Sequence, residues 1–201
     1  MQLQLPKTGG WGGKRKGAGR KRHTELQSRV RRPEHPARHP LHVTLRLRRD
    51  VPSLRERRRF KPIKRAFRHG CDRFGMRVCE FSVQYGHFHL VVEAADKRAL
   101  ARGMQGLEVR LAREINRMFG RRGPVFEDRY HARALRTPTV VKNTVHYVRY
   151  NMQKHRAERG LATHDWALDA FSSVSGEACW YDDKHGTIAL PQTWLLKNAP
   201  S

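Results

Sequence analysis

Two histidines stand one residue apart in the apolar run YGHFHLVVEA. Side chains alternate between the two faces of a β-strand, so Phe88, Leu90 and Val92 would point into a core. His87 and His89 would share the opposite face, about 7 Å apart at Cα. At that spacing both imidazoles can reach one metal ion at about 2.1 Å. The run predicts a pair of metal ligands, against the alternative of two polar residues on an open sheet face.

A second group of reactive side chains lies in the segment TVHYVRYNMQKH, which has the period of an amphipathic helix. Tyr147 and Asn151 are four residues apart and share one flank of the apolar stripe, whereas Tyr150 falls nearly opposite that stripe. A phenol can attack phosphorus when a metal polarises the phosphoryl group. An amide carbonyl is an oxygen ligand suited to Mg²⁺ or Mn²⁺. Tyr147 and Asn151 can therefore serve one site together.

The elements that must position these residues can be read from hydrophobic periodicity. The expected strands are 41–48, 77–85, 87–94 and 124–136, and the expected helices are 53–74, 96–120 and 138–158. The order β-α-β-β-α-β-α is a ferredoxin-like, or RRM-like, arrangement with one extra C-terminal helix. We therefore expect an α+β fold, with a four-stranded antiparallel sheet that has helices on one face and leaves the other face available.

Local signals set the expected helix ends. Ser53 and Glu56 form a capping-box pattern for the first helix. Gly120 is placed to stop the second helix. Pro138 occupies the favoured first position of the last helix.

The charge of the chain indicates a polyanionic partner. Forty-two Lys and Arg stand against eighteen Asp and Glu, a formal net charge of +24, which points to nucleic acid. Residues 1–40 are rich in Gly, Pro and basic residues and are expected to form a flexible arm. The expected DNA-contacting residues are Lys14, Arg15, Lys16, Arg20 and Lys21 in the arm and His42, Thr44 and Arg46 on strand 41–48. A solvated tail without a specific task is the alternative for the arm.

Other features narrow the class of protein. There is no apolar core typical of a secretory signal and no stretch of eighteen apolar residues, so we expect a cytoplasmic protein with no membrane partner. Cys71, Cys79 and Cys179 are odd in number and lack CxxC spacing, which argues against a disulfide framework. The expected division is an arm at 1–40, a catalytic domain at 41–160 and a C-terminal extension of unknown role at 161–201.

The combination of HFHLVVE with a downstream YVRYN helix resembles the REP-associated tyrosine transposases, single-tyrosine members of the HUH endonuclease superfamily. GGKRKGAGRK, HVTLRL and FEDRYHARAL add to the likeness, which covers about residues 12–160. The resemblance implies that His87, His89 and Asn151 hold Mg²⁺ or Mn²⁺ and that Tyr147 is the nucleophile. Gly86 departs from the family pattern, where Asn often precedes the first histidine, as does Met152, where Pro often follows the ligand Asn.

The resemblance also implies an activity and a partner. The expected reaction is nicking and joining of single-stranded DNA, next to a hairpin, through a 5′-phosphotyrosine and a free 3′-OH. The alternative is a noncatalytic, RRM-like nucleic-acid-binding module. Such modules stack bases on aromatic residues of the sheet, whereas here the corresponding positions carry His42, Thr44, His87 and His89. Whether the protein is a monomer or a homodimer is left open by these patterns.

Overall fold

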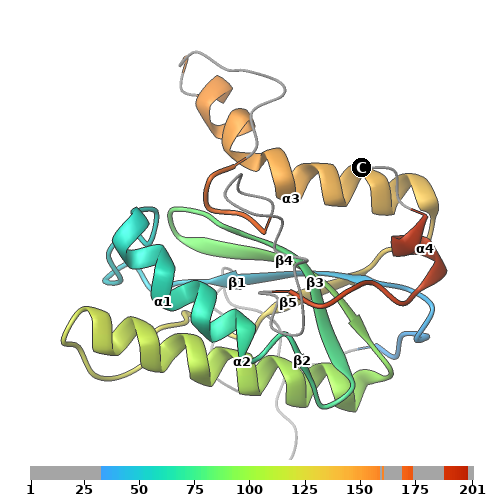
Figure 1. Ribbon diagram of the computed structural model, residues 1–201, viewed down its shortest axis with the longest axis horizontal. Coiled ribbons are helices and arrows are strands. Elements are labelled where there is room, and N and C mark those ends of the chain that lie inside the picture. Colours follow the sequence, from blue (N-terminus) through green and yellow to red (C-terminus); the bar gives the residue numbers. More distant parts are fainter. Residues whose placement is uncertain (1–32, 159, 161–168, 174–187, 199–201) are drawn as a thin grey trace, which may run out of the picture.

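The fold is built on one antiparallel sheet. The computed structural model describes residues 33–158, 160, 169–173 and 188–198, and within them five strands pair in the order β2-β3-β4-β1-β5 (Figure 1). The strands are β1 (Leu41–Arg46), β2 (Asp72–Arg73), β3 (Met76–Val83), β4 (His87–Ala94) and β5 (His131–Ala134). The helices are α1 (Arg57–Arg68), α2 (Lys97–Met118), α3 (Pro138–Glu158) and α4 (Trp194–Lys197). The order β3-β4-β1-β5 is ferredoxin-like, which confirms the expected α+β class, and β2 adds a short edge strand.

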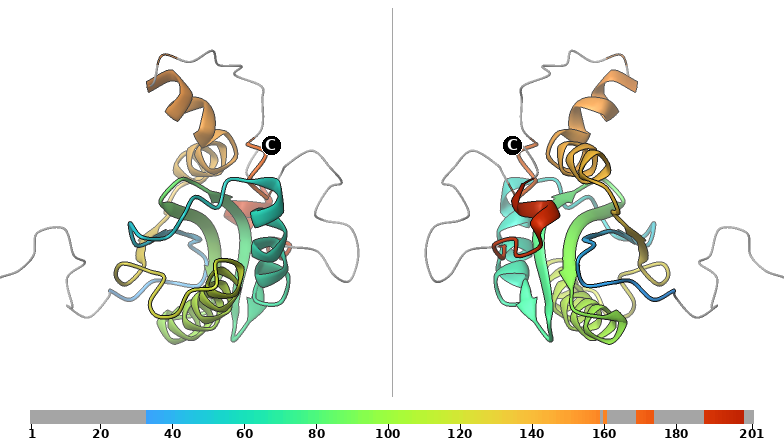
Figure 2. Two further views of the ribbon diagram at one scale, coloured as in Figure 1. Left: turned by 90° about the vertical axis from the view of Figure 1, so that its left-hand side faces the viewer. Right: turned by 90° about the vertical axis from the view of Figure 1, so that its right-hand side faces the viewer.

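The sheet is covered on both faces. α1 and α2 lie side by side along one face, and α3 runs across the other, as the front and side views show (Figures 1 and 2). A small apolar cluster joins α3 to β3 and β4 and contains Cys79, Val91, Leu135, Val141, Val145, Val148 and Leu196. Val91 and Glu93 are almost fully buried. The face that was expected to be available is therefore closed over part of β4.

α2 begins after a capping residue, packs closely on the sheet at one glycine and ends at another. Asp96 caps α2 by accepting a hydrogen bond from the Ala99 backbone N–H at 2.7 Å. At Gly103 an added Cβ would lie 2.5 Å from the Cβ of Met76, so no larger residue fits between α2 and β3. Gly120, with φ of +59°, supports the expected end of the helix.

The start of α1 differs from the expected capping box. α1 begins at Arg57 after Glu56, whose side chain makes no cap hydrogen bond. Ser53 Oγ instead accepts from the backbone N–H of Arg55 at 3.3 Å. The Arg55 side chain is drawn inward to a buried carboxylate, Asp169, and this holds the chain outside the helix. α1 also ends earlier than expected, at Arg68, because the following residues turn into β2.

The expected strand 124–136 is shorter in the structure. Only His131–Ala134 form β5, paired with β1. An isolated bridge joins Leu47 to Phe126, and the Glu127 N–H donates to the Arg46 carbonyl at 3.0 Å. Between these two pairings Tyr130 turns its side chain into the core, which interrupts the ladder.

Two short C-terminal pieces pack on β3. The Val83 N–H donates to Phe171 O at 2.9 Å, and the Ser173 N–H donates to Phe81 O at 2.8 Å. Further along, the Ala189 N–H donates to Val78 O at 2.8 Å. These bonds satisfy a strand edge that would otherwise be open to another chain. The boundary expected near residue 160 stays a prediction. No helix within the described ranges combines the length and apolar character needed to cross a membrane.

Candidate active site

β4 carries the paired histidines to the side of the sheet that α3 crosses. Phe88, Leu90 and Val92 are fully buried in the main core, as the alternation predicted. His87 and His89 point to the other face, where their Nε2 atoms lie 2.9 Å apart. His89 is buried and His87 is half-buried. The two imidazoles thus present nitrogen atoms to one small region beneath α3.

Tyr147 on α3 reaches the same region. Its hydroxyl lies 3.3 Å from Nε2 of His89, and the two rings meet edge to face with centroids 5.0 Å apart. Tyr150 is directed elsewhere and stacks on His146, with ring centroids 4.5 Å apart. The apolar stripe that packs α3 on the sheet therefore turns Tyr147 toward the histidine pair. No hydrogen bond joins Tyr150 to these histidines in the described part of the chain.

Asn151 lies one helical turn beyond Tyr147. Its side chain is 1% exposed, yet neither Oδ1 nor Nδ2 has a hydrogen-bond partner among the residues described. Buried amides are normally satisfied, so such a group needs an explanation. No hydrogen bond links Asn151 to the imidazoles within the described ranges. The predicted ligand is thus buried on the same helix, with an acceptor oxygen free for a further partner.

His42 and Thr44 on β1 contact the back of His89. Nε2 of His42 lies 3.1 Å from Nδ1 of His89, and Oγ1 of Thr44 lies 3.4 Å from the same nitrogen. Burial, with smaller contributions from Arg133, His131 and His87, lowers the pKa of His42 to about 4. His42 is therefore neutral at pH 7, and its Nε2 can accept a hydrogen bond from the N–H at His89 Nδ1. This would leave Nε2 of His89 as the lone-pair nitrogen facing His87 and Tyr147.

The residues expected to bind DNA are placed unevenly. Lys14, Arg15, Lys16, Arg20 and Lys21 lie outside the described residues. Arg46 is exposed and pairs with His87 in the β1–β4 register, so its side chain lies beside the histidine pair. His42 and Thr44 are half-buried against His89. DNA contact by these residues stays a prediction.

A buried polar network beside α3 was missed by the sequence analysis. Arg149 donates to Glu80 Oε1 at 2.6 Å, and Ser173 Oγ donates to Glu80 Oε2. Asp169 receives both guanidinium nitrogens of Arg55, at 2.9 and 2.7 Å, and its own N–H donates to the Arg149 carbonyl at 3.0 Å. The only signal for this network in the sequence was a glutamate inside an apolar strand. The network attaches α3 two residues from Tyr147.

The fold and the site together define a class of protein. Its members have a ferredoxin-like sheet and an extra helix that places a tyrosine hydroxyl beside paired histidines on a strand. The family model described as "Transposase IS200 like" matches residues 38–151. That match spans more than half of the chain, and the chain belongs to the IS200-like transposase family.

One solved structure agrees with this chain at the level of the fold, and a second is similar over part of it. The structure described as the REP-associated tyrosine transposase bound to a REP hairpin matches with a TM-score of 0.52 and 17% identity, over 76% of this chain and 98% of that one. A candidate transposase of Deinococcus radiodurans R1 matches with a TM-score of 0.42 and 13% identity, over 68% of this chain and 98% of that one. No curated protein matches the chain.

Proposed function

We propose that this transposase-family protein is a metal-dependent endonuclease and strand transferase that cuts single-stranded DNA through Tyr147. The observation that carries the proposal is the convergence of three groups: the Tyr147 hydroxyl lies 3.3 Å from His89 Nε2, which itself lies 2.9 Å from His87 Nε2. A nucleophile and two metal-ligand nitrogens within hydrogen-bond reach is the arrangement that metal-assisted phosphoryl transfer needs.

The residues present can hold a divalent cation. Two ligands at right angles about a metal at about 2.1 Å lie about 3 Å apart, close to the 2.9 Å between His87 and His89 Nε2. Asn151 supplies a buried amide whose oxygen has no partner among the described residues. His87, His89 and Asn151 would therefore hold Mg²⁺ or Mn²⁺. When bound, the ion would polarise the scissile phosphate and favour loss of the phenolic proton.

The covalent step follows from the position of Tyr147. Its oxygen bonds to phosphorus as the bond from phosphorus to the 3′ oxygen breaks, and the 3′ oxygen takes up a proton. The products are a 5′-phosphotyrosine and a free 3′-OH. A second 3′-OH can reverse the step and join strands, because the phosphoester is conserved in the covalent intermediate. His42 would keep His89 in the tautomer described above.

The partner that we propose is single-stranded DNA next to a hairpin. A net charge of +24 favours a polyanion, and the structural relative with the TM-score of 0.52 is described as bound to a REP hairpin. We also propose that the protein acts in the cytoplasm.

The test is trapping of the covalent intermediate. Incubation with hairpin-flanked single-stranded DNA and Mn²⁺ is expected to give a protein–DNA band that survives a denaturing gel, and EDTA is expected to abolish it. A band of equal intensity in EDTA would refute metal dependence. DNA binding without any adduct on cleavable substrates would favour the noncatalytic module instead.

A further inference from the structure

The turn between β2 and β3 holds an aromatic residue in an unusual backbone conformation. Arg73 pairs with Met76 across the turn, and the two residues between them, Phe74 and Gly75, have φ of +60° and +74°. This is the geometry of a type I′ hairpin turn, whose first position favours Asn, Asp or Gly. A phenylalanine there is strained, and such strain commonly marks a functional residue.

The ring of Phe74 lies beside α2 and keeps about half of its surface exposed. A Cβ added to Gly106 would lie 3.2 Å from Cε2 of Phe74, so the missing side chain of Gly106 makes room for the ring. Phe74 is nevertheless 53% exposed, and Val109 one turn along the helix is 43% exposed. The two side chains form a small exposed apolar surface beside a groove.

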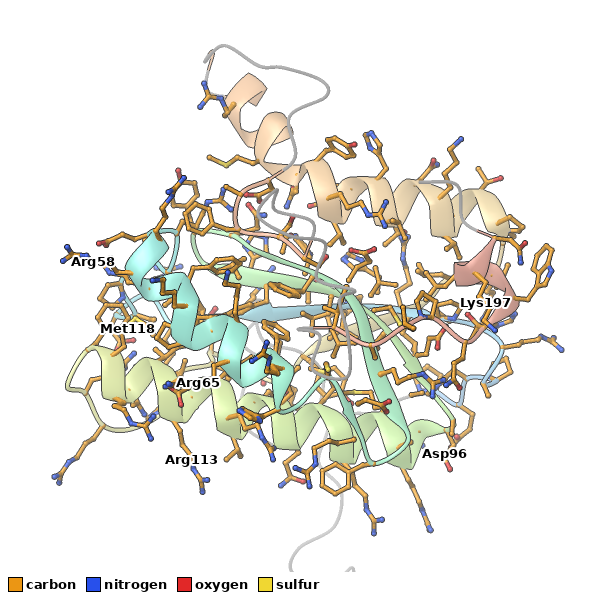
Figure 3. All side chains as sticks on the ribbon, viewed as in Figure 1. Arg58, Arg65, Asp96, Arg113, Met118 and Lys197 are labelled. Atoms are coloured by element: carbon orange, nitrogen blue, oxygen red, sulfur yellow. The ribbon has the colours of Figure 1, made fainter. Side chains whose placement is uncertain are left out.

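The surroundings of the ring are cationic. A groove of about 460 Å³ is lined by Phe74, Arg102, Gln105, Gly106, Val109, Arg110 and Arg113, with no carboxylate among them. Within the described part of the chain, Arg102 and Arg113 form no salt bridge, and Figure 3 shows Arg113 pointing away from the body of the molecule. Arg73 lies over the ring from its own side, 5.5 Å from the centroid.

We propose that this groove, here called the Phe74 groove, binds single-stranded DNA, with an unpaired base stacked on Phe74 and phosphates at Arg102 and Arg113. An open aromatic ring beside unpaired arginines is the combination that binds unpaired nucleotides. An acidic peptide could use the charges, but a flat exposed ring between them is better matched to the stacked base and the phosphates of an unpaired nucleotide. The proposal rests on the proposed function only in taking single-stranded DNA as the ligand.

The position of the groove gives it a task separate from cleavage. It lies on α2 and the β2–β3 turn, whereas Tyr147 and the histidine pair lie on the face that α3 crosses. DNA held there would be anchored away from the scissile phosphate. Loss of the groove should therefore weaken binding and leave the chemistry at Tyr147 intact.

The test uses a single-stranded 12-mer carrying 2-aminopurine, titrated in EDTA so that no cleavage occurs. Phe74→Asn is the informative variant, because Asn suits the type I′ turn and is expected to leave thermal stability unchanged or raised. Its affinity is expected to fall about fivefold or more, with loss of 2-aminopurine quenching. Phe74→Tyr keeps the ring and should bind like the parent protein, and Trp194→Ala removes an exposed aromatic residue on α4 as the matched control.

The arginines give an independent measure. Arg113→Gln is expected to reduce the slope of log K against log salt by about 0.7, whereas Phe74→Asn should leave the slope unchanged. Unchanged affinity and quenching in Phe74→Asn would overturn the proposal that the groove binds DNA. An equal loss of affinity in Trp194→Ala would overturn it too. The proposal would also be overturned if binding of a poly-glutamate peptide depended on Phe74 while binding of DNA did not. Adduct formation at Tyr147 is measured separately, so failure of the groove and failure of the proposed catalysis give different results.

Discussion

At the scale of single residues, the two tyrosines of α3 allow a test of the catalytic role proposed for Tyr147. Tyr147→Phe removes only the oxygen that lies 3.3 Å from His89 and keeps the ring in place. We expect adduct formation to fall to background while DNA affinity and thermal stability change little. Tyr150→Phe, which keeps the ring stacked on His146, should retain most activity. Mass spectrometry of the nucleotide-bearing peptide gives the attachment site, and an adduct on Tyr150 would refute the assignment.

His42 allows a test of how the metal ligand is oriented. Its Nε2 lies 3.1 Å from His89 Nδ1, so His42→Phe removes an acceptor and frees the His89 ring to change tautomer. Loss of such an orienting contact typically costs about tenfold or more in metal affinity. We expect that loss for Mn²⁺ by isothermal titration calorimetry, a smaller loss for Thr44→Val, and partial recovery in His42→Gln. Unchanged Mn²⁺ affinity in His42→Phe would leave His42 with only its predicted contact to DNA.

At the scale of elements, α3 is held in place by ion pairs that lie inside the molecule. Asp169 and Arg55 have side-chain exposures of 0% and 5%, and the Asp169 backbone bonds Arg149 of α3. Asp169→Ala leaves a buried guanidinium unpaired, which is expected to cost about 3 kcal/mol in urea unfolding. Adduct formation should also slow in the folded protein, because the segment whose backbone bonds Arg149 of α3 loses its side-chain anchor to Arg55.

The matched control for Asp169→Ala is an ion pair at the surface. Arg65 of α1, labelled in Figure 3, pairs with Glu114 of α2. The Arg65 side chain is 57% exposed. Arg65→Ala should therefore cost at most about 1 kcal/mol and leave adduct formation unchanged. Equal destabilisation by the two variants would mean that the buried pair contributes no more than a surface pair.

The same elements show where sequence reasoning succeeds. β4 and α3 were predicted well because their apolar periods are regular, and those periods alone set His87, His89 and Tyr147 on facing surfaces. The start of α1 was predicted wrongly because the side chain of Arg55 pairs with Asp169, which lies 114 residues away in the sequence, and not with its sequence neighbours. The cover of the sheet by α3, and the pairing of Glu80 with Arg149, likewise depend on contacts between distant segments. Local patterns carry no information on such contacts.

At the scale of the whole molecule, positive charge is spread over parts for which different roles are proposed. The active-site face has Arg46 beside His87, and the opposite layer has the arginines of the Phe74 groove. Residues 1–32 add ten Lys and Arg against one Glu. Because phosphate contacts dominate affinity for nucleic acid, these parts should contribute to binding strength, whereas the proposed chemistry depends on the few side chains under α3.

Deleting residues 1–32 tests the contribution of the basic arm to DNA binding. The deletion leaves the described residues intact, including Glu34, which binds Lys97 of α2 at 2.9 Å. We expect weaker binding of single-stranded DNA and a flatter salt dependence, by about 0.7 in the slope of log K against log salt for each lost phosphate contact. Adduct formation at low salt should persist, since Tyr147, His87 and His89 are untouched. A replacement arm with its Lys and Arg changed to Gln is the control for length. An unchanged salt slope in both proteins would show that the arm makes no phosphate contacts, and loss of the adduct at saturating DNA would show that the arm acts in the chemistry itself.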